Sequence, residues 1–239
     1  SAKFADHVIT VTDYWKDVIS ERSHIPDSKI SVILNLPDTR LFNPEKYANN
    51  KSSKNFILLY PGTLNTHCGI DIAIKAVKLV KEEIPSLRFM IYGKGSELKS
   101  LQLMVRGLDL ENTIFFNHHV PLQKVPQIMS EADVGIALLA GYNEYSQQAL
   151  NVKLFEFLAM GLPSIASKTK SIEYYLDEKV VELSEPNNYK DVARCIKNLY
   201  LNPDRRQELK RNGLNYISRN NWNLKKTDFF SIVDKLVSQ

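Results

Sequence analysis

The chain has 239 residues, a formal net charge of +4, 44% hydrophobic residues and 24% charged residues. This composition is typical of a globular protein, and the length allows one large α/β domain or two small ones with ample core. The mild positive charge is compatible with anionic ligands or an acidic membrane surface, but it is too small to indicate a nucleic-acid-binding protein. The two cysteines lie far apart and outside any metal-ligand spacing, and no apolar run has transmembrane length. We therefore expect a cytoplasmic protein, with peripheral attachment to the inner face of a membrane as the alternative.

The first 45 residues predict a short βαβ segment. A strand from Val8 to Thr12 precedes an amphipathic helix over Asp13 to Ser23, and a second strand runs from Ile30 to Leu34. Residues 44–55 are polar and lack periodicity, which is typical of a linker or an exposed loop. This composition predicts a domain boundary near that segment.

From Asn55 onward, strands and helices are expected to alternate regularly. The predicted strands are Asn55–Tyr60, Leu87–Tyr92, Thr113–Phe116, Asp133–Leu138, Ser164–Ser167 and Val180–Leu183. The predicted helices are Ile70–Ile84, Leu98–Gly107, Gln123–Ser130 and Tyr189–Tyr200, followed by a tail of two or three helices without a strand. Continuous apolar strands, each followed by a helix, indicate an α/β fold: a Rossmann-like, doubly wound parallel sheet covered on both faces. Its ligand is expected at the carboxyl ends of the strands.

A long loop is predicted from the strand end at Leu138 to Gln148. The stretch from Gln148 to Pro163 is then predicted as a polar loop and a helix of about three turns that ends at a glycine. The helix is apolar on nearly every side and is therefore expected to be buried. Lys153 and Glu156 interrupt it near its N-terminus. Because burying an unpaired ion is costly, two interpretations remain open. The two side chains neutralise each other, or the helix N-terminus serves a polar ligand such as a phosphate.

Several segments together carry a resemblance to a known family. They are YPGTLNTHCGIDIAIKAV, IPSLRFMIYGKGSEL, FFNHHVPLQKVPQIMSEADVGIAL, ALNVKLFEFLAMGLPSIAS and NNWNLKK. Residues 55–222 resemble the nucleotide-sugar-binding half of the retaining GT-B glycosyltransferases of the family four type. Residues 5–43 resemble the end of the acceptor-side domain and the crossover between domains. The resemblance implies three parts: residues 1–45 as the remnant of that domain, 46–220 as the donor-binding domain, and 221–239 as a helix packing back toward the acceptor domain. The acceptor domain itself would precede residue 1.

The resemblance also implies roles for individual residues. Glu156 matches the carboxylate that binds the ribose hydroxyls, and Gln148 stands where the family has a Glu that touches the transferred sugar. These two are the candidate catalytic residues. Two loop positions where many members carry cations aimed at the diphosphate hold the neutral residues Thr63 and Cys68. The implied donor-binding residues are Gly62, Thr63, Leu64, Gly93, Lys94, Gly95, His119, Val120, Pro121, Ala149, Leu150, Asn151, Val152 and Lys153.

Simpler interpretations apply to some of these positions. Gly93 and Gly95 are equally typical of a tight turn. Adjacent side chains such as His118 and His119 point apart at a strand end, which argues against a metal site there. Cys68 has only His67 as a basic neighbour in sequence and is expected to be a small loop residue.

The resemblance thus implies a glycosyltransferase that transfers a sugar from a UDP- or GDP-linked donor to an acceptor with retention, in polysaccharide or glycolipid synthesis. No cofactor or metal is expected. The expected partners are the nucleotide sugar, the missing acceptor domain and a membrane-linked acceptor, and no nucleic acid. The alternative is a non-catalytic binding or scaffold subunit, which Gln148, Thr63 and Cys68 favour. An epimerase is a weaker interpretation, and a nicotinamide-dependent oxidoreductase is weaker still because no G-x-G-x-x-G follows the first strand of the repeat.

Overall fold

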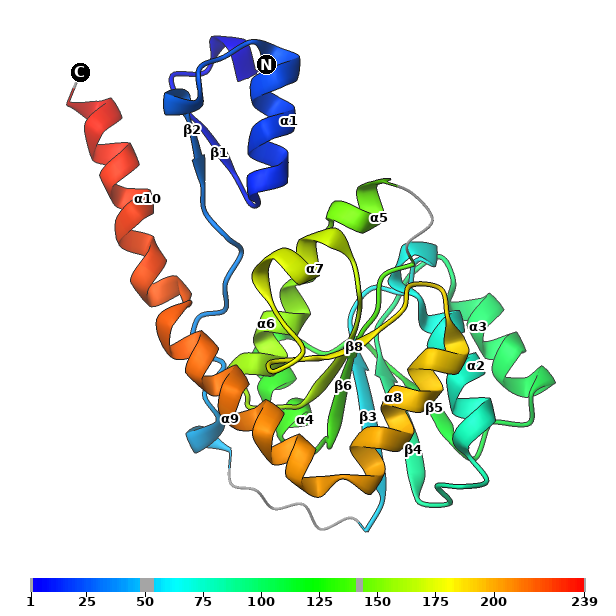
Figure 1. Cartoon of the computed structure of the whole chain (residues 1–239). Coiled ribbons are helices and arrows are strands. Elements are labelled where there is room, and N and C mark those ends of the chain that lie inside the picture. Colours follow the sequence, from blue (N-terminus) through cyan, green and yellow to red (C-terminus); the bar gives the residue numbers. More distant parts are fainter. Residues whose placement is uncertain (1, 48–53, 141–143, 239) are drawn as a thin grey trace.

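The structure is a computed structural model that describes residues 2–47, 54–140 and 144–238. Figure 1 shows a large α/β body, a small unit at the N-terminus, and a long helix at the C-terminus that runs from the body toward that unit. Among the described residues, no helix combines the length and the apolar character needed to cross a membrane.

The body is built on a six-stranded sheet in which every neighbouring pair is parallel. The strands are β3 (Phe56–Pro61), β4 (Leu87–Tyr92), β5 (Ile114–Asn117), β6 (Val134–Ala137), β7 (Ser164–Ser167) and β8 (Glu182–Ser184). Their order across the sheet is β5-β4-β3-β6-β7-β8. The chain therefore winds outward from β3 in one direction and resumes from β6 in the other, which confirms the predicted doubly wound, Rossmann-like fold.

Helices cover both faces of this sheet (Figure 1). One face carries α2 (Ile70–Val80), α3 (Leu98–Gly107) and α8 (Tyr189–Leu201), and the other carries α4 (Val125–Ser130), α6 (Val152–Ala159) and α7 (Lys170–Tyr175). Helix α9 (Pro203–Arg219) packs against α6, and α10 (Trp222–Val237) follows it. The predicted tail of helices without a strand is confirmed for the described residues.

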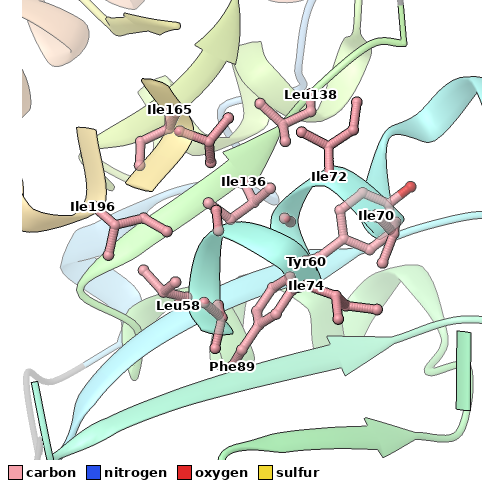
Figure 2. Close-up of a cluster of buried hydrophobic side chains, with 14 of the residues drawn as sticks. Leu58, Tyr60, Ile70, Ile72, Ile74, Phe89, Ile136, Leu138, Ile165 and Ile196 are labelled. Atoms are coloured by element: carbon pink, nitrogen blue, oxygen red, sulfur yellow. The ribbon is translucent and has the colours of Figure 1, made fainter. Parts of the chain in front are cut away.

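Burial on both faces explains why the strands are continuously apolar. In β3, Leu58 and Tyr60 pack against α2, whereas Leu59 between them packs on the opposite face with α6. Figure 2 shows the first of these clusters, where Ile74 of α2 lies over Leu58, Tyr60 and Phe89. When both faces of a strand are buried, apolar and polar residues do not alternate along it.

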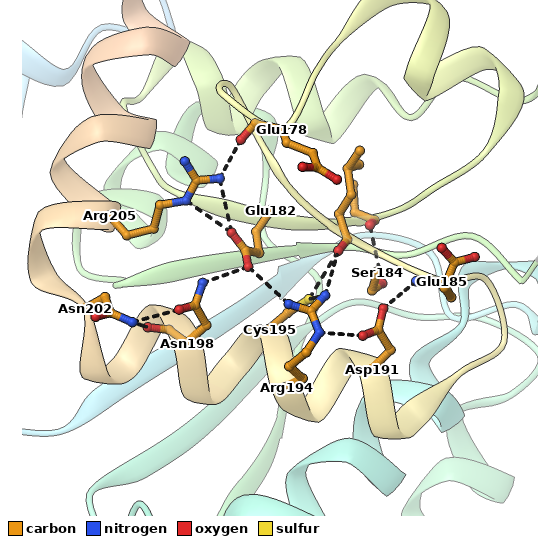
Figure 3. Close-up of polar contacts among 12 residues, drawn as sticks. Glu178, Glu182, Ser184, Glu185, Asp191, Arg194, Cys195, Asn198, Asn202 and Arg205 are labelled. Atoms are coloured by element: carbon orange, nitrogen blue, oxygen red, sulfur yellow. Dashed lines mark hydrogen bonds and ion pairs between the residues drawn. The ribbon is translucent and has the colours of Figure 1, made fainter.

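The edge strand β8 is closed by a polar network. The Glu182 carboxylate is buried, accepts a hydrogen bond from the Asn198 amide at 2.8 Å, and lies 3.3 Å from Arg205 Nε. Figure 3 shows this carboxylate between Arg205 and Arg194, which also pairs with Asp191 at 2.6 Å. The network joins β8 to α8 and α9 and thereby fixes the start of the C-terminal helices on the sheet.

Some elements differ from the sequence prediction. The segment predicted as a loop up to Gln148 contains the short helix α5 (Glu144–Gln148), and α7 was not predicted at all. Helix α2 ends at Val80 and not at Ile84, and β8 lies at 182–184 and not at 180–183. Both unpredicted helices are too short to show the helical period clearly, and α7 depends on a local signal, the capping of its N-terminus by the Thr169 side chain.

The N-terminal unit consists of β1 (Val8–Thr10), α1 (Asp13–Ser23) and β2 (Ile30–Val32). Its two strands form a separate parallel sheet. The chain then descends beside the start of α10, where the Trp222 N–H donates to Pro37 O at 3.2 Å. The predicted boundary segment 44–55 begins with a short helical turn, and its middle part, residues 48–53, lies outside the described residues.

Candidate active site

The sheet reverses its winding direction between β3 and β6, and the candidate site lies at the carboxyl ends of these strands. Ligands of open α/β sheets bind at such a switch point. The loop after β3 begins at Gly62, and helix α6 brings Lys153 against it. A Cβ at Gly62 would lie 3.0 Å from Lys153 Nζ and 3.4 Å from Tyr60 Oη. The ammonium therefore rests against bare backbone, and a side chain at position 62 would displace it.

The loops after β3 and β4 are held together by backbone hydrogen bonds. Gly62 N donates to Tyr92 O at 2.8 Å, and Leu64 N donates to Lys94 O at 2.9 Å. A Cβ at Gly93 would lie 1.9 Å from Gly62 O, and one at Gly95 would lie 2.2 Å from Leu64 O. These two glycines are thus required by the close approach of two loops, which gives the tight-turn interpretation its physical reason. Their contact with a donor stays a prediction.

Lys153 lies in the first turn of α6, with its Nζ 4.1 Å from the centroid of the Tyr60 ring. The Tyr60 hydroxyl donates to Thr63 O at 2.6 Å, which fixes both the ring and the loop. Burial lowers the pKa of Lys153 to about 8, against the opposing influence of Cys68 and Glu156. Burial also raises the pKa of Tyr60, with a smaller contribution from Cys68. The ring face gives the ammonium partial compensation for its lost hydration.

Glu156 lies one turn further along α6. Burial raises the pKa of its carboxyl, and the positive charge of Lys153 acts in the opposite direction. In the described part of the chain, no ion pair or hydrogen bond joins Glu156 to Lys153. Their charges nevertheless compensate each other through space, because each shifts the pKa of the other toward the charged form. Both interpretations, mutual neutralisation and a polar ligand at the helix N-terminus, therefore stay predictions.

The N-terminus of α6 faces the same region. Its N-cap residue, Asn151, makes no side-chain hydrogen bond to the helix, and Leu154 N donates to Asn151 O at 3.0 Å. The N–H groups of Val152 and Lys153 precede the first intrahelical bond, as in any α-helix, so a ligand can accept from them. We expected this helix to be buried, but the Val152 side chain is 37% exposed. The helix ends at Ala159, and Gly161, two residues later, has a φ of 62°, the left-handed conformation of the predicted glycine stop.

Gln148 is the last residue of α5 and is buried. Its backbone oxygen accepts a hydrogen bond from Ser171 Oγ of α7 at 2.8 Å. Ala149 and Leu150 then lead to the N-terminus of α6, which places Gln148 close to Lys153 along the chain. The sequence did not predict that a helix would hold this residue.

The third predicted loop follows β5 and contains His118, His119, Val120 and Pro121. Both histidines are exposed. The loop lies next to the one after β4, because Gly93 N donates to Asn117 O at 3.4 Å. Within the described ranges, no three His, Cys, Asp or Glu residues gather closely enough to hold a metal ion. The prediction that no metal takes part stays untested.

The fold brings Gly62, Thr63 and Lys153 together and adds Tyr60, which the sequence did not single out, and Cys68, which was expected to be only a small neutral loop residue. Tyr60 carries the ammonium on its ring, and Cys68 lies near enough to influence both neighbours. The position of Tyr60 near the end of a buried strand was a signal that could have suggested the first. Only the fold reveals that Cys68 lies close to Tyr60 and Lys153.

Comparison with known proteins agrees with this arrangement. The family profile described as "Glycosyl transferases group 1" matches residues 42–216. The chain belongs to this family. It is similar to the O-antigen chain mannosyltransferase RfbU of Salmonella typhimurium, with 26% identity over 204 residues, covering 85% of this chain and 54% of that protein.

Solved structures show the same fold. A glycosyltransferase from Rickettsia africae superposes with a TM-score of 0.82 and 18% identity, covering 97% of this chain and 64% of that one. Anabaena Alr3699/HepE, solved in complex with UDP, superposes with a TM-score of 0.81 and 19% identity, covering 100% of this chain and 65% of that one. This GT-B glycosyltransferase likeness concerns the fold alone. The chain spans about half the length, or less, of the curated relatives it matches.

Proposed function

We propose that this chain is the donor-binding part of a retaining glycosyltransferase that uses a UDP- or GDP-linked sugar. One observation carries the proposal. Lys153 places a largely desolvated ammonium against the bare backbone of Gly62 at the switch point, and in the described part of the chain it has no carboxylate partner in contact. A largely desolvated cation that no carboxylate contacts is unfavourable for folding, even with Glu156 acting on it through space, so its position favours an anionic ligand.

The geometry suggests a role for each group. A nucleotide diphosphate lies across the N-terminus of α6 and accepts from its first N–H groups, with Lys153 beside it. Glu156 accepts hydrogen bonds from the two ribose hydroxyls, because a carboxylate offers two acceptor oxygens to a diol. Gln148 lies toward the sugar. When the glycosidic bond to the diphosphate breaks, negative charge develops on the leaving oxygen, and the ammonium and the helix N–H groups stabilise it.

The position of Lys153 also weakens the main argument for a non-catalytic scaffold, which is the lack of cations in the loop after β3. The loop lacks the two cations that the family resemblance leads one to expect, because Thr63 and Cys68 are neutral. The Lys153 ammonium nevertheless lies beside Gly62 and near Cys68, so α6 supplies positive charge that the loop does not. The non-catalytic alternative then depends mainly on Gln148, whose amide lacks the charge of a carboxylate.

The wider context of the reaction is proposed from relatives. They include proteins of O-antigen and colanic acid synthesis, which favours a polysaccharide or glycolipid product. An acceptor domain outside residues 1–239 completes the site, and a membrane-linked acceptor fits a cytoplasmic protein that works at the inner face of the membrane. The helix N-terminus and Lys153 take the role that a metal ion has in other transferases.

The test is calorimetric titration of the chain with UDP, GDP and ADP. We expect one of them to bind, and we expect Glu156→Ala to weaken that binding by about 10- to 150-fold, which corresponds to about 1.5–3 kcal/mol for hydrogen bonds to a charged group. Glu111→Ala, at an exposed position in the turn before β5, is the matched control and should bind as the unaltered chain does.

Three outcomes contradict the proposal. Failure to bind any of the three nucleotides favours the scaffold. Equal binding by both variants removes Glu156 from the site. Unfolding of Glu156→Ala, seen as loss of the cooperative thermal transition, would mean that the carboxylate is structural.

A further inference from the structure

Helix α7 is hydrogen-bonded near both of its ends to parts of the chain that are distant in sequence. It begins at Lys170 after the Thr169 cap, and its buried Ile172 packs on the sheet body. Its last residue, Tyr175, reaches the N-terminal unit, and Ser171 near its start reaches Gln148. Figure 1 shows α7 lying between α6 and the lower end of α1.

The contact with the N-terminal unit consists of two hydrogen bonds through one hydroxyl. Tyr175 Oη accepts from Asp13 N at 3.0 Å and donates to Asp13 Oδ2 at 2.7 Å. Asp13 is the first residue of α1, so the hydroxyl also satisfies one of the N–H groups that have no partner within that helix. Burial raises the pKa of Tyr175, so the phenol keeps its proton and donates throughout the neutral range.

The contact with the candidate site is buried. Ser171 Oγ donates to the backbone oxygen of Gln148 at 2.8 Å, and both residues are almost fully covered. Ser171 and Tyr175 are four residues apart, so they lie on the same side of one rigid helical segment. One helical turn of α7 thus connects Asp13 of α1 to the backbone of Gln148.

The other contacts that join the N-terminal unit to the body lie elsewhere. The chain leaves the unit beside the start of α10, where Trp222 N donates to Pro37 O at 3.2 Å and Asn223 Nδ2 donates to Thr39 Oγ1 at 2.7 Å. These two hydrogen bonds hold the segment that connects the N-terminal unit to the body. The contact between Tyr175 and Asp13 is made elsewhere, at the start of α1.

We propose that Tyr175 is a positioning residue: by bonding to Asp13 it ties the orientation of the N-terminal unit to α7, and through Ser171 it holds Gln148 in place beside the N-terminus of α6. The inference rests on the proposed function for the role of Gln148, but the coupling itself is a property of the chain and can be measured without turnover. Closure of the two units over a donor then aligns the residue closest to the sugar, and opening releases it.

Hydrogen exchange tests the coupling directly. We expect Tyr175→Phe to speed amide exchange at residues 13–16, and also at residues 146–152, by about 3- to 10-fold each, the effect of losing hydrogen bonds of ordinary strength. Ser171→Ala should raise exchange at 146–152, and adding Tyr175→Phe to it should raise it no further, because the link is already broken. Tyr174→Phe is the matched control, since it removes a neighbouring, exposed hydroxyl from the same helix.

Titration with UDP and with UDP-glucose is the second readout. Tyr175→Phe should leave the affinity for UDP within about twofold while weakening the additional contribution of the sugar by about 3- to 10-fold. A structural role of Tyr175 would instead lower both affinities together. If the unaltered chain binds neither these compounds nor GDP and GDP-mannose, the proposed function fails, and the exchange experiment still decides the coupling. Faster exchange at 13–16 alone, or additive effects of the two substitutions at 146–152, would overturn the inference.

Discussion

Lys153 is a residue whose place in the fold costs stability. Its ammonium is largely removed from water, and the Tyr60 ring and two neighbouring acidic groups compensate only in part, because the pKa remains lowered from 10.5 to about 8. Between these two pH values the unfolded chain binds a proton that the folded chain does not. The stability of the folded state therefore rises with pH across this window.

We predict that Lys153→Met removes this rise and makes the ligand-free chain more stable at pH 7. The gain is about 1–2 kcal/mol, after allowing for partial exposure of the side chain. Urea unfolding at pH 7, 8 and 9 measures it, with the upper limit set below the pH at which exposed tyrosines ionise. The same variant should lose most of its affinity for a nucleoside diphosphate. Lys99→Met, at an exposed position of α3, is the control and should change neither property. Parallel pH profiles for Lys153→Met and the unaltered chain would refute this assignment.

At the residue scale, the sequence predicted what local chemistry can show. Lys153 and Glu156 stood out because they interrupt an apolar helix, and both lie at the site. That they do not form a direct ion pair could not be predicted, because helical spacing allows contact without requiring it. Cys68 depends on the fold for its neighbours, and the role of Tyr60 as a platform for the ammonium follows only from the approach of α6 to β3.

At the element scale, two glycines without side chains allow the central helix α6 to pack closely against its neighbours. Gly135 in β6 lets the Phe157 ring lie directly on the strand, since a Cβ there would come within 2.6 Å of two ring atoms. Gly213 in α9 allows a similar approach of Leu158 from the other side, with 3.1 Å to a Cβ. The position of Lys153 and of the helix N-terminus depends on this packing.

We predict that Gly135→Ala destabilises the chain by about 1–3 kcal/mol, because overpacking forces the strand or the Phe157 ring to shift. Nucleotide affinity should fall as well, since α6 carries both Lys153 and Glu156. Gly107→Ala is a matched control at the end of α3, where a Cβ would meet nothing within 4 Å, and it should be neutral or slightly stabilising. Chemical denaturation and nucleotide titration on the same samples check both parts, and equal stability of the two variants would contradict the packing argument.

The elements that were predicted share long, uninterrupted patterns, as in β4 and α3, whose bounds match the prediction. The elements that were missed are α5 and α7, with five and six residues. Such short helices are stabilised by contacts distant in sequence, including Ser171 with Gln148 and Tyr175 with Asp13. The hydrophobic periodicity of the sequence cannot predict these contacts, although the bond from Ser171 holds the backbone of Gln148.

At the scale of the whole molecule, the N-terminal unit is too small to form a complete domain. Its sheet has two strands, and Phe4, Ile9 and Val11 are exposed on it or beside it. Helix α10 ends near this unit, and the two line a cavity of about 500 Å³ with mostly polar residues, including Asp6, Lys29 and Lys235. Exposed apolar side chains such as those of Phe4, Ile9 and Val11 are typical of an interface, and the solved structures that share the fold extend well beyond the matched part.

We predict that the chain of 239 residues binds its nucleotide without transferring or hydrolysing the sugar. Lys153, Glu156 and the N-terminus of α6, to which we have assigned nucleotide binding as a proposal, all belong to the body, so we expect binding without another domain. Transfer needs an acceptor held against the sugar and a cleft closed to water, and the N-terminal unit described here offers only two strands and one helix toward that purpose. The measurement is incubation of the chain with UDP-glucose and GDP-mannose, followed by quantification of released nucleotide against a blank without protein. Binding of nucleotide by calorimetry in the same preparation is the positive control for a folded site. Multiple turnovers by this chain would mean that these residues alone complete the active site. The hypothesis that transfer needs a second, acceptor-binding domain would then be wrong.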